Sequence, residues 1–307
     1  MEYYRFGHED TGCMRRLLSY IRANLLLAWK IQTYLVTDSM PEIPELEAIA
    51  QRLTEAFSGK TIRGLSVHNH LVIHGTTVER FEGLPTGKVF QSFDADGKFI
   101  IAGMSDSLQI VINPMLTGRF RISTRPRKPL KSDVLSVSTD GPTLWYDDRK
   151  FMSRVYLVSG GDYKQVAGFI GRGPSALDPE LTLESFRTHI RSFHGQTKNV
   201  IQNQRFVKGI GNAYADEILL YAGILPFRRR GSLDDGEMAR LYVAMRNVLG
   251  RYRDMLSTRS LIDLGPEKRD FLMIHGKGGG ICPLCGGRIS EVTANRFKTN
   301  YCQNCQR

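Results

Sequence analysis

The alternation of apolar and polar residues predicts a helix, then a run of strands, then a second group of helices. The first helix follows Pro41 and has one apolar face at helical spacing, formed by Leu46, Ile49, Ala50, Leu53 and Phe57. From about residue 60 to residue 160, short runs with period two replace this spacing. They predict strands over residues 62–68, 88–94, 98–104, 108–113, 119–123, 143–147 and 153–159.

Turn residues support an antiparallel arrangement of these strands. Asp96-Gly97 is a strong hairpin signal between the second and third strands. Short strands with tight turns and no intervening helices are typical of an antiparallel sandwich or barrel. Pro114 should end the strand before it, so we expect residues 113–118 to form an irregular loop.

The second half of the chain is predicted to be helical. Residues 171–179 contain two glycines and two prolines and indicate a link between domains. Helices are then expected over residues 183–193, 199–206, 213–222 and 234–257. The predicted fold class is α+β: an N-terminal β-sandwich flanked by helices, then a helical domain. The expected boundaries are 41–172, 180–260 and a terminal part at 270–307.

Residues 1–39 differ from the rest, because arginines and leucines alternate there as in an amphipathic helix. A transit peptide is one interpretation, although Glu2, Glu9 and Asp10 fit it poorly. The other interpretation, which we favour, is an extension outside the working protein. The sequence contains no run of 18 apolar residues, so no membrane-spanning helix and no membrane partner are expected.

Charge and cysteines narrow the class of partner. Lysine and arginine total 42 against 31 aspartates and glutamates, a net charge of +11 that favours nucleic acid. Four of the five cysteines form Cys282-x-x-Cys285 and Cys302-x-x-Cys305. Two such pairs can close one tetrahedral, structural zinc site, and they indicate a reducing compartment.

The most reactive candidate is Pro41, in the stretch Pro41-Glu-Ile-Pro-Glu45. If Met40 were the start and were removed, Pro41 would carry a free secondary amine, a nucleophile beside the carboxyl groups of Glu42 and Glu45. If the chain begins at Met1, this nitrogen is an amide and cannot attack. Both glutamates also have a purely structural explanation, because acidic residues favour the first turn of a helix.

Two further stretches are candidates for contacts with DNA. Gly209, Gly211 and Asn212 form a turn that opens a helix, where backbone N–H groups can hold a phosphate. The run Arg149-Lys150-Phe151 follows a strand, and such a tip can insert into a base stack while its cations hold phosphates. A solvated turn with a half-buried phenylalanine is the alternative for this tip.

From Met40 to Arg307 the chain resembles the formamidopyrimidine and endonuclease VIII type DNA glycosylases. The resemblance rests on five stretches in order: Pro41–Glu45; Gly97-Lys98; Asp147–Phe151; Gln204-Arg-Phe-Val-Lys-Gly-Ile-Gly-Asn-Ala-Tyr-Ala-Asp-Glu217 with Ala222-Gly-Ile-Leu-Pro226; and the four-cysteine finger ending Cys305-Gln306. It implies a β-sandwich, a helix–two-turn–helix domain with a zinc finger, and a base-excision-repair glycosylase with abasic-site lyase activity. Residues 1–39 have no counterpart in the family pattern.

The resemblance also implies a role for each site residue. The amine of Pro41 attacks C1′ of the deoxyribose, the product is an iminium, and β- and δ-elimination follow. Glu42 acts as acid and base, Glu45 orients the site or shuttles protons, and Lys98 holds a phosphate. The residues expected to contact double-stranded DNA with damaged bases or abasic sites are Leu116, Arg149, Lys150, Phe151, Lys198, Gly209, Gly211, Asn212, Arg296 and Lys298. We expect a monomer, in the bacterial cytoplasm at the nucleoid, or in the nucleus or an organelle of a eukaryote.

Three departures from the family pattern leave alternatives open. Asn113-Pro-Met-Leu-Thr-Gly118 replaces a common His-Leu-Gly-Met-Ser-Gly, and the arginine of the finger falls on Phe297, so Arg296 or Lys298 would have to replace it. Residues 261–271 are short for the loop that closes over 8-oxoguanine. The lesion is then an oxidised pyrimidine, a ring-opened purine or an abasic site. A non-catalytic DNA-binding relative and a zinc-ribbon protein of RNA or the ribosome are the other hypotheses.

Overall fold

The computed structural model describes residues 40–265, 268–294 and 297–307. Its first helix, α2 (Ile43–Phe57), begins with Glu42 as N-cap and Pro44 in the first turn, where a missing N–H has no cost. Glu42 and Glu45 form a capping box, because each side chain accepts a hydrogen bond from the backbone of the other. The positions of these two carboxyl groups are therefore set by the start of the helix.

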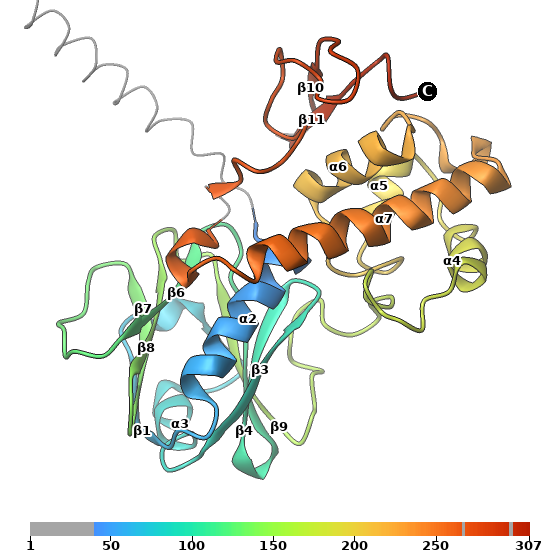
Figure 1. Ribbon diagram of the computed structural model, residues 1–307. Helices are drawn as coiled ribbons and strands as arrows, with labels where there is room; N and C mark the ends of the chain where they lie inside the picture. Colours follow the sequence, from blue (N-terminus) through green and yellow to red (C-terminus); the bar gives the residue numbers. More distant parts are fainter. Residues whose placement is uncertain (1–39, 266–267, 295–296) are drawn as a thin grey trace, which may run out of the picture. The chain divides into compact units, whose positions relative to one another are not determined.

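Two sheets form the N-terminal layers (Figure 1). One has the order β1-β7-β8-β6 and the other the order β2-β9-β5-β4-β3; every pair is antiparallel except β2 with β9. Their apolar faces share one core with α2 and the short helix α3 (Val78–Gly83). The strands are β1 (Ile62–Val67), β2 (Ile73–His74), β3 (Phe90–Asp96), β4 (Phe99–Met104), β5 (Leu108–Asn113), β6 (Gly118–Ser123), β7 (Asp133–Thr139), β8 (Thr143–Asp148) and β9 (Arg154–Ser159).

A second core lies among the helices that follow (Figure 1). These helices are α4 (Leu183–Ile190), α5 (Thr197–Ile201), α6 (Asn212–Ala222) and α7 (Asp235–Leu256). Ile43, from the first turn of α2, is buried in this second core although the rest of α2 packs on the sheets. The beginning of α2 therefore lies where the two cores meet.

The C-terminal part is a hairpin of β10 (Ser290–Ala294) and β11 (Phe297–Tyr301). A small core of Leu220, Ile274, Cys282, Ile289 and Cys302 holds the hairpin region against α6. No helix among the described residues is long and apolar enough to cross a membrane.

The predicted elements are largely present, with three corrections. The strand β7 was missed, because its inward residues Val134, Leu135 and Val137 lie among serines and a threonine that weaken the apolar signal. A helix does lie between strands: α3 (Val78–Gly83), too short to show a helical period. The helix expected over residues 199–206 ends at Ile201, and turns follow it. The hairpin at Asp96-Gly97 is confirmed.

Candidate active site

Glu42 links the start of α2 to the start of α6. Its carboxylate accepts hydrogen bonds from the backbone N–H groups of Ala213 (2.9 Å), Tyr214 (3.3 Å) and Gly211. Burial raises the pKa of Glu42, whereas Arg269 and these N–H donors act to lower it. A buried carboxyl group with a raised pKa therefore lies next to Pro41, which is itself buried.

Glycines make this close approach possible. At Gly211 an added Cβ would lie 2.6 Å from Cδ of Glu42, and at Gly209 it would lie 2.7 Å from Cβ of Ile43. Gly209 also has a φ of +99°, which L-residues rarely adopt. Its carbonyl accepts the N–H of Ile43 at 3.0 Å. In this structure the first turn of α2 thus packs against the Gly-x-Gly turn that was predicted to bind DNA.

Arg269 is a part of this site that the sequence did not reveal. Its Nε donates to Oε1 of Glu45 at 2.6 Å, its Nη2 donates to the carbonyl of Met40 at 3.1 Å, and its Nη1 lies 3.7 Å from Oε1 of Glu42. The hydroxyl of Tyr214 also donates to Glu45, at 3.1 Å. No motif marks Arg269, because it lies 224 positions from Glu45.

Lys98 is brought to the site by the β3–β4 turn. Asp96 in this turn forms ion pairs with Arg172 (2.7 Å) and Lys208 (2.5 Å), both from the region that leads into the helices. Burial lowers the pKa of Lys98, while the negative charge of Glu42 raises it. The half-buried Lys98 therefore lies within electrostatic reach of Glu42.

Asp148 organises the two loops that carry the predicted DNA-inserting residues. Its buried carboxylate accepts hydrogen bonds from Thr117, in the loop of Leu116, and from Ser153, which follows the tip of Phe151. Burial raises the pKa of Asp148, but the hydrogen bonds from Ser153 and Thr117 outweigh it and leave this pKa below its usual value.

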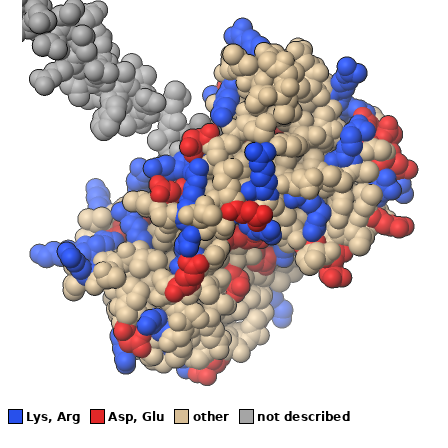
Figure 2. Space-filling view, in the orientation of Figure 1, with Lys and Arg blue, Asp and Glu red and all other residues tan. Residues whose placement is uncertain are grey.

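The burial of the tip agrees with both interpretations, an inserting tip and a solvated turn. Phe151 has a φ of +50° and is partly buried against the sheet core, while Arg149 and Lys150 are exposed. Figure 2 shows basic side chains spread over this face of the molecule. Among the exposed basic residues, Arg125, Lys128 and Lys131 belong to the loop between β6 and β7. The N–H of Asp148 donates to the carbonyl of Ser132, so this basic loop adjoins the tip.

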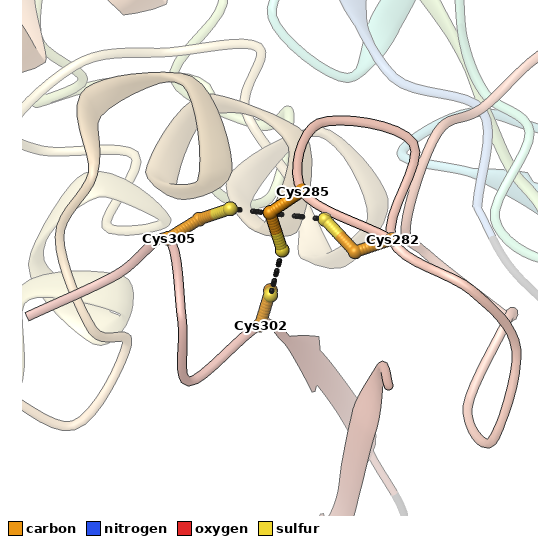
Figure 3. Close-up of side chains that lie close together, drawn as sticks. All are labelled: Cys282, Cys285, Cys302 and Cys305. Carbon is orange, nitrogen blue, oxygen red and sulfur yellow. Dashed lines mark hydrogen bonds between the residues drawn. The ribbon is translucent and has the colours of Figure 1, made fainter. Parts of the chain in front are cut away.

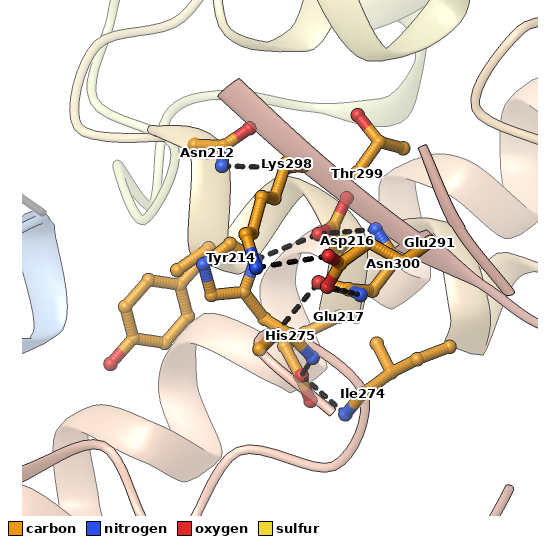
Figure 4. A network of polar contacts seen from close by, with 12 residues as sticks. Asn212, Tyr214, Asp216, Glu217, Ile274, His275, Glu291, Lys298, Thr299 and Asn300 are labelled. Atoms are coloured by element: carbon orange, nitrogen blue, oxygen red, sulfur yellow. Dashed lines mark hydrogen bonds and ion pairs between the residues drawn. The ribbon is translucent and has the colours of Figure 1, made fainter. Parts of the chain in front are cut away.

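A buried polar network joins α5 and α6 to the hairpin (Figure 4). The ammonium of Lys198 lies 2.6 Å from Oδ1 of Asp216 and donates to Oγ1 of Thr299 at 2.8 Å. Asp216 also contacts Nδ1 of His275 (2.7 Å) and the N–H of Asn300 (3.0 Å). Lys198 is only 5% exposed, so in this structure its charge is directed at Asp216 rather than at solvent.

Two other predicted DNA contacts lie beside this network. The amide of Asn212 donates to the carbonyl of Lys298 at 2.9 Å, and Nζ of Lys298 lies 2.9 Å from Glu291. Phe297, where the family pattern has arginine, is 65% exposed at the start of β11. Arg296, the alternative replacement, lies outside the described residues.

The four cysteines predicted to bind metal do converge (Figure 3). All four sulfur atoms lie within 4.8 Å of one another, with Sγ atoms of Cys282 and Cys305 at 3.8 Å and those of Cys285 and Cys302 at 3.5 Å. The N–H of Gly287 lowers the pKa of Cys285 to about 7, which favours a thiolate. These four residues can hold one metal ion.

Comparison with known proteins decides the family. The model of the formamidopyrimidine-DNA glycosylase N-terminal domain matches residues 40–155, and that of the formamidopyrimidine-DNA glycosylase H2TH domain matches residues 172–255. A formamidopyrimidine-DNA glycosylase of Moorella thermoacetica is 32% identical over 260 residues, covering 82% of this chain and 94% of that protein. The chain belongs to the formamidopyrimidine-DNA glycosylase family. A second family member, from Enterococcus faecalis, is 30% identical over 87% of this chain and 97% of its own length.

Solved structures of formamidopyrimidine-DNA glycosylases have the same fold. The Lactococcus lactis protein, solved in complex with DNA containing an abasic site, has a TM-score of 0.78 at 25% identity, covering 87% of this chain and 99% of that one. The Thermus thermophilus protein has a TM-score of 0.75 at 26% identity, covering 87% and 98%. The α+β class and the family resemblance predicted from the sequence are thereby confirmed.

Proposed function

We propose that this glycosylase excises damaged bases and cleaves abasic sites with the nitrogen of Pro41 as its nucleophile. The observation that carries the proposal is the meeting of Glu42 and Glu45 beside Pro41 at the start of α6, with Lys98 in electrostatic reach. The capping box alone accounts for the positions of Glu42 and Glu45, but a protein that only bound DNA would have no need of Lys98 and two buried carboxyl groups clustered around this nitrogen. The non-catalytic alternative is therefore not favoured.

The proposed reaction begins at C1′ of the deoxyribose. The neutral amine attacks C1′, the bond between C1′ and the base breaks, and the base leaves with a proton. Opening of the sugar ring gives an iminium between Pro41 and C1′. Loss of a C2′ proton then breaks the bond to the 3′ phosphate, and a second elimination breaks the bond to the 5′ phosphate. An α-amine has a pKa of about 7.7–8.0, so a useful fraction is neutral near pH 7.

We assign the remaining roles from position and charge. Glu42, whose pKa is raised by burial, would exchange protons with the sugar and the iminium. Glu45 would fix the orientation of the site through its hydrogen bonds with Tyr214 and Arg269. Lys98 would hold a phosphate beside the lesion.

The DNA contacts are assigned to the surface around this site. Arg149, Lys150, Phe151 and Leu116 would fill the gap left by the extruded nucleotide, whose release from the stack costs a few kcal/mol. Near the hairpin, the proposed contacts are Asn212 and Lys298, with Arg296. Lys198 would stabilise this surface from the protein interior and would not contact DNA, because its ammonium is paired with the buried Asp216.

We propose zinc as the ion held by the four cysteines. Zinc–sulfur bonds of about 2.3 Å in a tetrahedron place sulfur atoms about 3.8 Å apart, close to the 3.8 and 3.5 Å between paired sulfurs here. The ion would stabilise the hairpin that carries Lys298.

Structures of a relative bear on the class of DNA lesion that this enzyme acts on. The L. lactis relative was solved with abasic-site DNA and another of its structures contains Fapy-dG DNA, which supports an abasic site or a ring-opened purine over other lesions. The working enzyme would span three parts, at 41–172, 180–260 and 270–307, without residues 1–39. It would act wherever the cell keeps its DNA, at the nucleoid in a bacterium.

Borohydride trapping on abasic-site DNA tests the nucleophile. Protein started at Met1 is compared with protein started at Met40, and each N-terminus is read by mass spectrometry. We expect a covalent product only from protein that begins with Pro41, and none after its amine is acetylated. Trapping by acetylated protein would overturn the amine mechanism. Absence of trapping by both forms, with tight DNA binding, would support the non-catalytic relative.

A further inference from the structure

The guanidinium of Arg269 contacts both carboxyl groups of the proposed chemistry and the backbone that directly precedes Pro41. It contacts the carboxylates of Glu45 (2.6 Å) and Glu42 (3.7 Å) and the carbonyl of Met40 (3.1 Å). The side chain is 7% exposed, so it points into the protein and not to the surface. These contacts come from the stretch before the cysteine cluster, a part of the chain to which neither family model extends.

We propose that Arg269 is a positioning residue of the active site, which holds the Glu42 and Glu45 carboxylates together next to the nitrogen of Pro41. This inference rests on the proposed function. It adds a specific requirement: a residue near the C-terminal end of the chain, Arg269, is needed to arrange the nucleophile and its two carboxyl groups near the N-terminal end.

Electrostatics explain why a cation is needed. Glu42 and Glu45 are 4% and 1% exposed and belong to the same helical turn. Two buried carboxylates this close repel each other, and without a neighbouring cation one of them would take up a proton. The other groups facing this pair are Lys98 from the β3–β4 turn and Tyr214 from α6, whose phenol is neutral because burial raises its pKa well above the usual value.

The same cation would act on the nucleophile. The Met40 carbonyl carbon is bonded to the nitrogen of Pro41, and C=O and C–N bonds are about 1.2 and 1.3 Å long, so Nη2 of Arg269 lies no more than about 5.7 Å from that nitrogen. In a chain that begins at Pro41, this position places a permanent positive charge next to the amine. A nearby cation disfavours the ammonium and so favours the neutral, attacking amine.

The experiment compares Arg269→Gln and Arg269→Lys with the unchanged protein and with Lys268→Met, a matched control on an exposed neighbour. The substrate is abasic-site DNA, and trapping rates are measured from pH 5.5 to 9. For Arg269→Gln we expect a trapping rate at pH 7 at least tenfold lower and a profile displaced to higher pH. Arg269→Lys should restore part of the rate, and affinity for DNA with a tetrahydrofuran abasic analogue should change less than threefold.

A second readout is independent of activity. Carbon-13 NMR of glutamate side chains follows the Glu42 and Glu45 carboxyl groups in the full chain, with Glu42→Gln and Glu45→Gln for assignment. We expect Arg269→Gln to leave one of the two protonated at a pH where both are charged in the unchanged protein. Unaltered titrations would overturn the inference, as would an unaltered trapping profile. Failure of the unchanged protein to trap would count against the proposed function alone.

Discussion

The carboxylate of Glu42 accepts the backbone N–H of Ala213 at 2.9 Å, across 171 positions of sequence. A helix N-terminus stabilises negative charge, and here the charge comes from the first turn of another helix. The start of α2 and the start of α6, the first helix after the Gly-x-Gly turn, therefore hold each other in place. Disturbing the turn should disturb the chemistry even without contact to DNA.

Gly211→Ala tests this dependence. Gly211 has a φ of −121°, which suits any residue, so only the 2.6 Å approach of an added Cβ to Cδ of Glu42 matters. We expect about 1–3 kcal/mol lower stability in urea unfolding and a trapping rate reduced at least tenfold. Gly231→Ala is the control, because no atom lies within 4 Å of its added Cβ. Equal trapping by both variants would contradict the prediction.

Asp148→Asn should uncouple the two inserting loops. Asparagine would bring an NH₂ donor to the N–H and hydroxyl of Ser153, so we expect about 2–3 kcal/mol lower stability at pH 7, measured by urea unfolding. Because the pKa of Asp148 is lowered in the folded protein, its carboxylate contributes stability above the unfolded pKa of about 3.9 and loses it as pH falls through the lower folded value.

The difference between Asp148→Asn and the unchanged protein should therefore stay constant from pH 7 to pH 5 and shrink only below about pH 4. Asp140→Asn, at an exposed aspartate, serves as the control. A difference that grows as the pH falls would reverse the sign that we derive.

Lys198→Met should affect folding more than it affects contacts with DNA. The change leaves Asp216, which is fully buried, without its ion-pair partner, and such losses cost about 3–5 kcal/mol. Lys298→Met breaks an exposed pair with Glu291 and should cost at most about 1 kcal/mol. Urea unfolding of both variants checks the ranking, and equal losses would show that Lys198 is not a structural cation.

Removal of the metal should release the hairpin first. Mass spectrometry under native conditions should find one zinc ion in the unchanged protein and in Cys13→Ser, and none in Cys302→Ser. Hydrogen exchange should then increase in β10 and β11 while β3 to β5 remain protected, and DNA affinity should fall. Full affinity without zinc would exclude the hairpin as a DNA contact.

Local chemistry made much of this fold predictable. The capping residues at Glu42 and Glu45, the hairpin at Asp96-Gly97 and the spacing of the cysteines each act over a few positions, so the sequence displays them. Arg269 could not be found this way, because its partners lie more than 200 positions away and no spacing rule connects them. The partner of Lys198 was missed for a related reason: a buried and an exposed lysine look the same in a sequence.

The turn between β3 and β4 has a consequence for the order of events during folding. Asp96 forms ion pairs with Arg172 and Lys208, and Lys98 follows it two positions later in the sequence. We therefore expect Lys98 to reach its final position near Glu42 only after the segments that carry these two cations have packed on the sheet. A sandwich that folded before its helices would then carry Lys98 out of place, so we expect partly synthesised or partly unfolded protein to be unable to cut DNA.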